Sequence, residues 1–179
     1  PYSQIFYVEG FLNMASQNWI TGHINSFEYL DGVPEVLVPD NLKTGVTKVK
    51  MGEPILNRAY RDFAHYYGTT IVPARVRKPK DKASVEGNVG YISRQIIASL
   101  RDYQCFSLTR LNEKILEEVD KLNNQDFQKK EGSRRSVFEE EEKSKLIPLP
   151  PKRYQQSEWR TAKVQLNYHI QVNRMYYSV

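Results

Sequence analysis

The feature that most constrains how this chain folds is the regular alternation of strand and helix patterns over its first 128 residues. Segments rich in aromatic and β-branched residues, typical of strands, alternate with segments whose apolar residues recur at helical spacing. The expected strands cover residues 2–12, 33–38 and 69–74, and the expected helices cover residues 15–30, 54–67, 82–101 and 109–127. This order predicts an α/β fold, in which helices cover the faces of a sheet.

The ends of the expected helices carry signals that start and stop helices. The first helix is expected to end before the Asp31-Gly32 turn, and the second at Gly68. Pro54 suits the first turn of the second helix, where no backbone N–H is needed. Asp81 is a suitable N-cap for the third helix.

The last third of the chain has a different character. Residues 129–153 combine a polar stretch, an acidic run and the sequence Pro148-Leu149-Pro150-Pro151, which favours an extended linker. Residues 164–172 alternate apolar and polar side chains, and Asn173-Arg174 reads as a turn before a returning strand. The expected division is an α/β core over 1–128, a linker over 129–153 and the start of a β domain over 154–179, with the core and the β domain both partial.

Several classes of protein are excluded by composition. No apolar run approaches the roughly 18 residues that a membrane-spanning helix needs. The single cysteine, Cys105, excludes a disulfide framework and a multi-cysteine zinc site, so we expect a reducing, cytoplasmic setting. The chain begins at Pro1 without Met and ends within a strand pattern, so we expect a piece of a longer protein.

The net charge of +5 is distributed unevenly. Residues 1–71 are net −2, whereas residues 72–101 are net +5 and residues 146–179 are net +4. Five of the cations form a basic block: Arg75, Arg77, Lys78, Lys80 and Lys82. Such a block either binds phosphate groups or is a solvated loop, and the charge pattern alone favours neither.

Two carboxylates stand at positions that suit a binding site. Asp40 follows the expected buried strand 33–38, and in open α/β sheets ligands bind beyond the carboxyl ends of strands. Pro39-Asp40-Asn41 is also good turn chemistry, so a turn-forming aspartate is the simpler alternative. Taken by itself, Asp40 is more often such a turn residue than a ligand.

Glu86 lies early in the expected third helix, at the edge of its apolar stripe, and glycines follow it at 87 and 90. Each glycine inside a helix costs about 1 kcal/mol relative to alanine, which suggests a bulky partner or close helix packing there. The alternative is a surface glutamate paired with Lys82, four residues earlier. If Asp40 and Glu86 meet at one edge, roughly 4–8 Å apart, their hard oxygen ligands suit Mg²⁺ bound against phosphates.

The motifs around both acids resemble IstA-type insertion-sequence transposases. The resemblance rests on residues 38–46 (VPDNLKTGV) and 79–87 (PKDKASVEG), which stand at the expected distance from each other. Further matching stretches are Tyr7-Val8-Glu9, Trp19-Ile20, Gly22-His23, residues 132–138 (GSRRSVF) and residues 159–164 (WRTAKV). Together they cover essentially the whole chain.

The resemblance implies a ribonuclease-H-like integrase core with an Asp-Asp-Glu triad and a mixed sheet, followed by a small β-barrel. Asp40 would be the second acid and Glu86 the third, while the first Asp and the first two strands would lie upstream of Pro1. The implied activity is metal-dependent cleavage of transposon ends and strand transfer, with two Mg²⁺ or Mn²⁺ ions in the complete site. Implied partners are DNA, further copies of the chain on DNA, and an ATP-hydrolysing helper protein.

Lys43 and Lys82, which are close in sequence to the two acids, are the best candidates for DNA phosphate contacts, and Asn41 is a candidate for orienting Asp40 or contacting DNA. Three histidines (His23, His65 and His169) lack metal-ligand spacing and are interpreted as packing or surface residues. Two other functions stay open from the sequence. One is a ribonuclease-H-like nuclease without strand transfer, and the other is a non-enzymatic DNA-binding or interaction remnant of a decayed element. Without the first Asp, this fragment alone is expected to be inactive.

Overall fold

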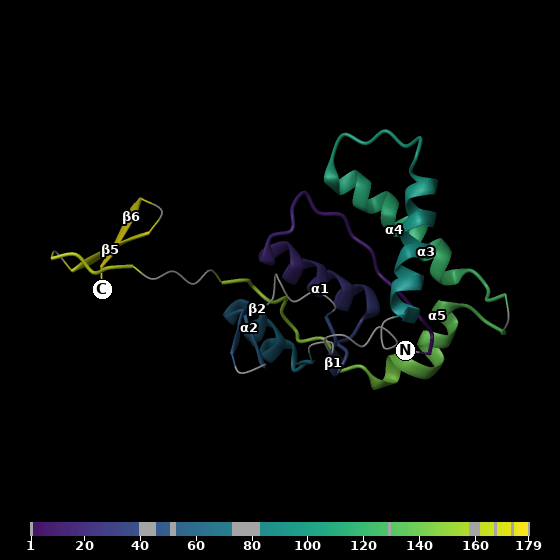
Figure 1. Ribbon diagram of the computed structural model, residues 1–179, viewed down its shortest axis with the longest axis horizontal. Coiled ribbons are helices and arrows are strands. Elements are labelled where there is room, and N and C mark those ends of the chain that lie inside the picture. Colours follow the sequence, from purple (N-terminus) through teal and green to yellow (C-terminus); the bar gives the residue numbers. More distant parts are fainter. Residues whose placement is uncertain are drawn as a thin grey trace.

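Helices dominate the computed structural model, and the strands form short pairs, of which the C-terminal one lies apart from the helices (Figure 1). The structure describes residues 2–39, 46–50, 53–72, 83–128, 130–157, 162–166, 168–172 and 174–178, with the backbone alone for 46–50, 53–56 and 83–86. The elements in chain order are α1 (Ser16–Leu30), β1 (Val36–Leu37), β2 (Val46–Lys50), β3 (Glu53–Leu56), α2 (Arg58–Tyr67), β4 (Thr70–Ile71), α3 (Ala83–Ser99), α4 (Leu108–Asn124), α5 (Arg134–Val137), a π-helical turn η2 (Phe138–Glu142), a 3₁₀ turn η3 (Lys143–Lys145), β5 (His169–Val172) and β6 (Met175–Ser178).

The described strands form three separate pairs. β1 and β4 are parallel, with Val36 opposite Thr70 and Leu37 opposite Ile71. β2 pairs with β3, and β5 pairs with β6, both antiparallel. Strands β1 and β4 fall inside the segments 33–38 and 69–74 that the sequence predicted, and α1, α3 and α4 match their predicted helices to within a few residues.

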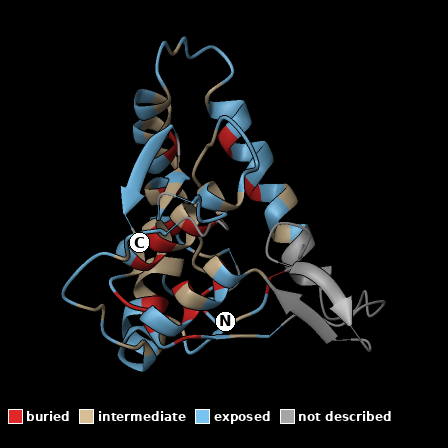
Figure 2. Ribbon diagram, turned by 90° about the vertical axis from the view of Figure 1, so that its left-hand side faces the viewer, coloured by how far each residue is buried: buried red, intermediate tan, exposed pale blue. Residues whose placement is uncertain are grey.

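The first of two hydrophobic cores, the aromatic core, lies between α1 and α2. Phe63 of α2 is fully buried and stacks on Phe27 of α1, with ring centroids 5.6 Å apart. Tyr60 and Tyr67, one turn before and after Phe63, extend the cluster along the same face of α2. Figure 2 shows the buried residues concentrated where helices face one another.

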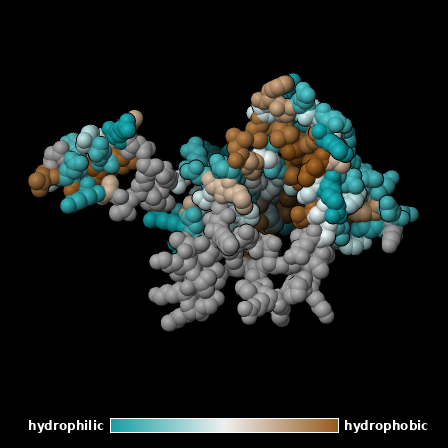
Figure 3. Space-filling view, turned by 45° about the horizontal axis from the view of Figure 1, so that its top comes forward, coloured by the Kyte–Doolittle hydropathy of each residue, from teal (hydrophilic) through white to brown (hydrophobic). Residues whose placement is uncertain are grey.

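The second core, the helical core, joins α3, α4 and the N-terminal residues. Ile92 and Ile96 of α3 are buried against Ile115 and Val119 of α4. These four residues follow the apolar periodicity of both helices. Figure 3 shows hydrophobic residues at the surface of this half of the molecule, and Phe106, in the loop before α4, is 97% exposed.

Residues 2–12 are extended but are not a strand, so the predicted first strand is corrected. Their backbone is hydrogen-bonded to side chains of α4 where a strand would have a neighbouring strand. Asn123 donates to the Phe6 carbonyl (2.8 Å) and accepts from the Phe6 N–H (3.4 Å). Asn112 pairs with Gly10 in the same way, at 3.1 and 2.8 Å. The side chains still alternate as in a strand, because Phe6 and Val8 pack on the helical core.

Ser3 provides a third attachment of the same segment. Its backbone N–H and its hydroxyl both donate to the Glu142 carboxylate of η2, at 3.0 and 2.6 Å. Burial alone would raise the pKa of Glu142, but these hydrogen bonds hold that pKa below its usual value. The acidic run therefore contributes one structural anchor.

The start of α2 also differs from the prediction. Pro54 lies in β3, opposite Val49, and not in the first turn of the helix. A proline is tolerated in a two-stranded pair, where one edge needs no donor. The helix begins at Arg58, and its N-cap is Asn57, whose side chain accepts from the Ala59 N–H at 2.9 Å.

Residues 129–153, predicted to be an extended linker, contain α5, η2 and η3 in their first half. Their second half is extended but lies on the aromatic core, where Ile147 and Leu149 pack. Val33 and Ile147 exchange two backbone hydrogen bonds of 2.8 and 2.9 Å. Gly32 makes this approach possible, because a Cβ at that position would lie 2.7 Å from the Leu146 Cβ.

The β5–β6 hairpin at the C-terminal end confirms the predicted turn and returning strand, with Val172 opposite Met175. Its first strand begins later than predicted, because Tyr168 has a left-handed backbone (φ 59°). The described residues contain no closed barrel. Within the described ranges, no helix is both long and apolar enough to cross a bilayer.

Candidate functional site

The predicted site is built around the carboxyl ends of β1 and β4. The two strands are held side by side by hydrogen bonds from the Thr70 N–H to the Glu35 carbonyl (2.9 Å) and from the Val72 N–H to the Leu37 carbonyl (2.8 Å). Because the strands are parallel, both chains leave the pair at the same edge. Asp40 follows β1 by three residues, and the basic block begins four residues after β4. The backbone topology therefore sends both predicted site segments from one edge.

Helix α3 follows the basic block directly in sequence. Glu86 is the fourth residue of this helix, and only its backbone is described. A Cβ on Gly87 would meet nothing within 4 Å, and one on Gly90 would meet only the Arg94 side chain at 3.9 Å. Close packing against the described elements thus does not explain these two glycines.

The remaining predicted site residues lie outside the described ranges. These are Asp40, Asn41, Lys43, Arg75, Arg77, Lys78, Lys80 and Lys82. Their contacts, and the predicted separation of the Asp40 and Glu86 carboxylates, stay predictions. Among the described residues, no three His, Cys, Asp or Glu side chains are grouped to hold a metal ion.

His23 packs among the rings of the aromatic core, with Trp19, Phe27, Tyr60 and Phe63 as neighbours. Its Nδ1 lies 2.9 Å from the Trp19 carbonyl, and its Nε2 lies 3.3 Å from the Tyr60 hydroxyl. A carbonyl only accepts, so Nδ1 carries the proton and Nε2 accepts from Tyr60. Burial lowers the pKa of His23, so the ring is neutral at pH 7. The packing interpretation of this histidine is confirmed.

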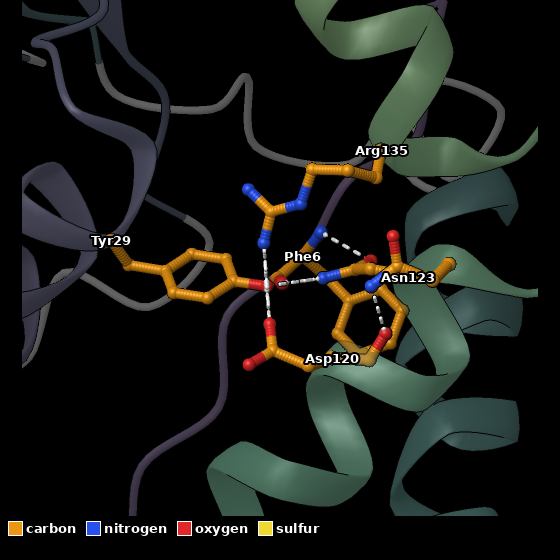
Figure 4. A network of polar contacts seen from close by, with 6 residues as sticks. Phe6, Tyr29, Asp120, Asn123 and Arg135 are labelled. Carbon is orange, nitrogen blue, oxygen red and sulfur yellow. Dashed lines mark hydrogen bonds and ion pairs between the residues drawn. The ribbon is translucent and has the colours of Figure 1, made fainter.

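A polar cluster around Tyr29 joins the two cores (Figure 4). The Tyr29 hydroxyl donates to Asp120 Oδ1 at 2.8 Å and accepts from Asn123 Nδ2 at 2.9 Å. Arg135 of α5 also donates to this hydroxyl and forms a 3.3 Å ion pair with Asp120. Burial and the hydrogen bond to Asp120 raise the pKa of Tyr29 to about 12. Four parts of the chain therefore meet here: α1, α4, α5 and, through Asn123, the backbone of Phe6.

A second polar group lies in a pocket of about 640 Å³ between the N-terminal segment and α1, lined in part by Tyr7, Phe11 and Trp19. Glu9 also lines this pocket. Asn25 Nδ2 lies 2.8 Å from both Glu9 carboxylate oxygens, and the Tyr7 hydroxyl donates to Glu9 at 3.0 Å. Burial and this hydrogen bond raise the pKa of Tyr7 well above its usual value. We call this hollow the Glu9 pocket.

Comparison with known proteins identifies the relatives of the chain. A Sinorhizobium fredii protein named as a transposase is 40% identical over 99% of this chain, which spans 34% of that relative. A Burkholderia multivorans protein named as the transposase for insertion sequence IS408 is 41% identical over 90% of this chain, which spans 31% of it. The chain is homologous to insertion-sequence transposases.

The resemblance seen in the sequence motifs is therefore confirmed. It extends to the Pseudomonas aeruginosa transposase for insertion sequence element IS21, which is 24% identical over 99% of the chain. The chain spans about a third of the length of the first two relatives. No family model matches it.

Solved structures give the fold. The catalytic core domain of BIV integrase superposes with a TM-score of 0.59 at 12% identity, covering 80% of this chain and 83% of that one. A chain of the simian T-cell lymphotropic virus intasome, solved with PP2A regulatory subunit B56 gamma, has the same TM-score and identity and covers 90% of this chain and 51% of its own. The predicted ribonuclease-H-like integrase core is thus confirmed as the fold.

In this transposase homologue, the motif at 132–138 has a structural role that the sequence did not reveal. Ser133 caps α5 by accepting from the Ser136 N–H at 3.1 Å. Arg134 donates to the Leu122 carbonyl, and Arg135 joins the Tyr29 cluster. The motif was visible in the sequence, but its partners lie elsewhere along the chain.

Proposed function

We propose that this chain is a partial catalytic core of a DNA transposase. In the longer protein it would cleave transposon ends and join the freed 3′ hydroxyl to target DNA. The observation that carries the proposal is the shared edge of β1 and β4, from which the Asp40 segment and the basic block both leave. Homology to insertion-sequence transposases supports the same activity.

Asp40 and Glu86 are the proposed metal ligands and catalytic acids. Their segments fit a hard divalent cation, because Asp40 follows the carboxyl end of a parallel strand and Glu86 lies in the first turns of the helix beyond the basic block. Two Mg²⁺ or Mn²⁺ ions, when bound, would supply charge stabilisation for in-line phosphoryl transfer. The carboxylates of this chain hold the cations and thereby orient the reacting phosphate.

The basic block, with Lys43 and Asn41, is the proposed DNA contact surface. Arg75, Arg77, Lys78, Lys80 and Lys82 carry five charges immediately before the helix of Glu86. The positive side chains of this block would offset the negative charge of the DNA phosphates and hold the DNA backbone next to Asp40 and Glu86.

The proposal also includes four features that the resemblance to IstA-type transposases implies: the position of the first Asp, the domain division, the oligomer and the helper protein. The first Asp of the triad lies upstream of Pro1, so this fragment alone is inactive. The domain division at 129–153 and 154–179 marks the passage to a C-terminal β-barrel. The assembled protein is an oligomer on DNA and works with an ATP-hydrolysing helper.

The test is a strand-transfer assay of the longer protein with transposon-end DNA, target DNA and Mg²⁺. We expect joined product from the wild type, and a loss of at least about 100-fold in Asp40→Asn and in Glu86→Gln, because each removes a charged metal ligand. Glu35→Gln is the matched control, since Glu35 is an exposed acid just before β1. Nicked DNA without joined product would indicate a nuclease, and DNA binding without either product would indicate a non-enzymatic remnant.

A further inference from the structure

We propose that the Glu9 pocket binds a basic side chain of a peptide, with arginine as the preferred residue and apolar residues beside it. The inference uses none of the residues of the proposed DNA site and does not depend on the transposase activity. It is an interaction site for a partner polypeptide with an exposed arginine between apolar side chains.

The first argument is the charge of Glu9. Its carboxylate is hydrogen-bonded only by neutral groups in the described part of the chain, the Asn25 amide and the Tyr7 hydroxyl. The nearby Arg153 is directed elsewhere, because it forms an ion pair with Glu28 and donates to Asn25 Oδ1. A carboxylate offers about four acceptor positions, so Glu9 can accept further charged donors.

The orientation of Glu9 is also fixed in advance. Arg153 occupies the Asn25 carbonyl oxygen, which leaves the Asn25 amide N–H groups to face Glu9. Tyr7 is held in turn by the Tyr29 ring, at a centroid distance of 5.3 Å. A ligand therefore finds a carboxylate already positioned, which lowers the entropy lost on binding.

The second argument is the lining of the pocket. Aromatic residues Tyr7, Phe11 and Trp19 line the same pocket as Glu9. A carboxylate among apolar groups favours a cation, because pairing offsets its lost hydration. Guanidinium groups also stack on aromatic faces and bind carboxylates with two hydrogen bonds, which makes arginine the better fit than lysine.

The third argument is the rim, which indicates a peptide and not an isolated cation. Leu12 and Met14 border the pocket and are 85% and 86% exposed. Exposed apolar side chains beside a hollow mark a contact surface, and methionine adapts to varied partners. A nucleic acid is disfavoured here, because its phosphates would be repelled by Glu9.

The test uses the tryptophan fluorescence of the 179-residue chain. The chain has two tryptophans, so Trp159→Phe leaves Trp19, in the pocket wall, as the only reporter. The probes are the blocked tripeptides Leu-Arg-Leu and Leu-citrulline-Leu, which match in shape and differ in charge. We expect the arginine peptide to change the Trp19 emission and to bind at least about tenfold more tightly than the citrulline peptide.

The variants locate the effect. Glu9→Gln should reduce the affinity for the arginine peptide to that for the citrulline peptide. Glu140→Gln is the matched control, because Glu140 is an exposed acid outside the pocket lining, so this variant should retain the preference for arginine. Circular dichroism confirms that each variant is folded.

Three outcomes would overturn the proposal. Equal affinity for both peptides would make the pocket an uncharged apolar groove. Unchanged arginine binding in folded Glu9→Gln would place the binding site elsewhere. A Trp19 emission that changes with protein concentration, without peptide, would indicate that a second copy of the chain fills the pocket.

Discussion

The aromatic core and the helical core are stabilised by different kinds of contact. Between α1 and α2, rings stack on rings, and His23 is the one histidine that packs among them in the described structure. Between α3, α4 and the N-terminal segment, aliphatic side chains fill the interior, and the fully buried Asn123 bonds to a backbone and to Tyr29. The aromatic core is therefore stabilised mainly by the packing of rings, whereas the helical core also depends on the hydrogen bonds of the buried Asn123.

This difference matters for where the proposed site is anchored. The aromatic core includes Leu37 and Ile71, which pack against it from β1 and β4. The edge that carries the proposed site therefore rests on the aromatic core. The helical core supports α3 instead, through Ile92 and Ile96. A change in the aromatic core should therefore disturb the β1–β4 edge, and a change in the helical core should disturb α3.

The largest expected effect is the loss of a ring from the aromatic core. Phe63→Ala should lower the free energy of unfolding by about 3–5 kcal/mol, because Phe63 is fully buried and packs on Phe27, Tyr60 and Tyr67. Urea unfolding followed by circular dichroism measures this. Phe106→Ala is the matched control, since Phe106 is 97% exposed and its loss should change stability by less than about 0.5 kcal/mol.

The next effect concerns the buried amide of the helical core. Asn123→Ala should lower the free energy of unfolding by about 1–3 kcal/mol, because it leaves the Phe6 N–H and carbonyl unpaired. Asn124→Ala is the control, because Asn124 is exposed and its amide donates to the Asp120 carbonyl of its own helix. A larger loss from Asn123→Ala than from Phe63→Ala would reverse the proposed order of the two cores.

A third, smaller effect is a pH dependence of the free energy of unfolding that arises from the aromatic core. Burial lowers the pKa of His23 in the folded state, so the unfolded chain binds more protons and stability falls as the pH drops below about 6.5. For one proton the slope is at most about 1.4 kcal/mol per pH unit. Urea midpoints measured from pH 7.5 to 5.5 should show this slope.

Two variants assign the slope to His23. His23→Phe should flatten it, whereas His65→Gln should preserve it, because His65 is exposed on the opposite face of α2 from the core. An unchanged slope in folded His23→Phe would show that the pH dependence arises outside the aromatic core.

The contrast also explains what could be predicted from the sequence. Apolar periodicity correctly placed α1, α3 and α4, because it records which face of a helix is buried. It misassigned residues 2–12, because a strand pattern reports an extended backbone and two faces but not the partner. Here the partners are Asn112 and Asn123, more than 100 residues away along the chain.

The candidate site, too, could be predicted only where the signal is local in the sequence. The rule that ligands bind beyond the carboxyl ends of strands led to Asp40, and the structure confirms that β1 and β4 end at one edge. The geometry of the two carboxylates depends on side chains outside the described ranges and stays a prediction. The Glu9 pocket was missed, because no local pattern marks a pair such as Glu9 and Asn25, which are 16 residues apart.

The asparagine contacts to residues 6 and 10 have a consequence for how this segment could change. Both amides grip peptide groups, which every amino acid except proline presents alike. Attachment of the segment to α4 is thereby independent of the side chains at positions 7, 9 and 11, which line the pocket. Such a segment can change the side chains that it presents to the pocket and keep its backbone contacts with α4.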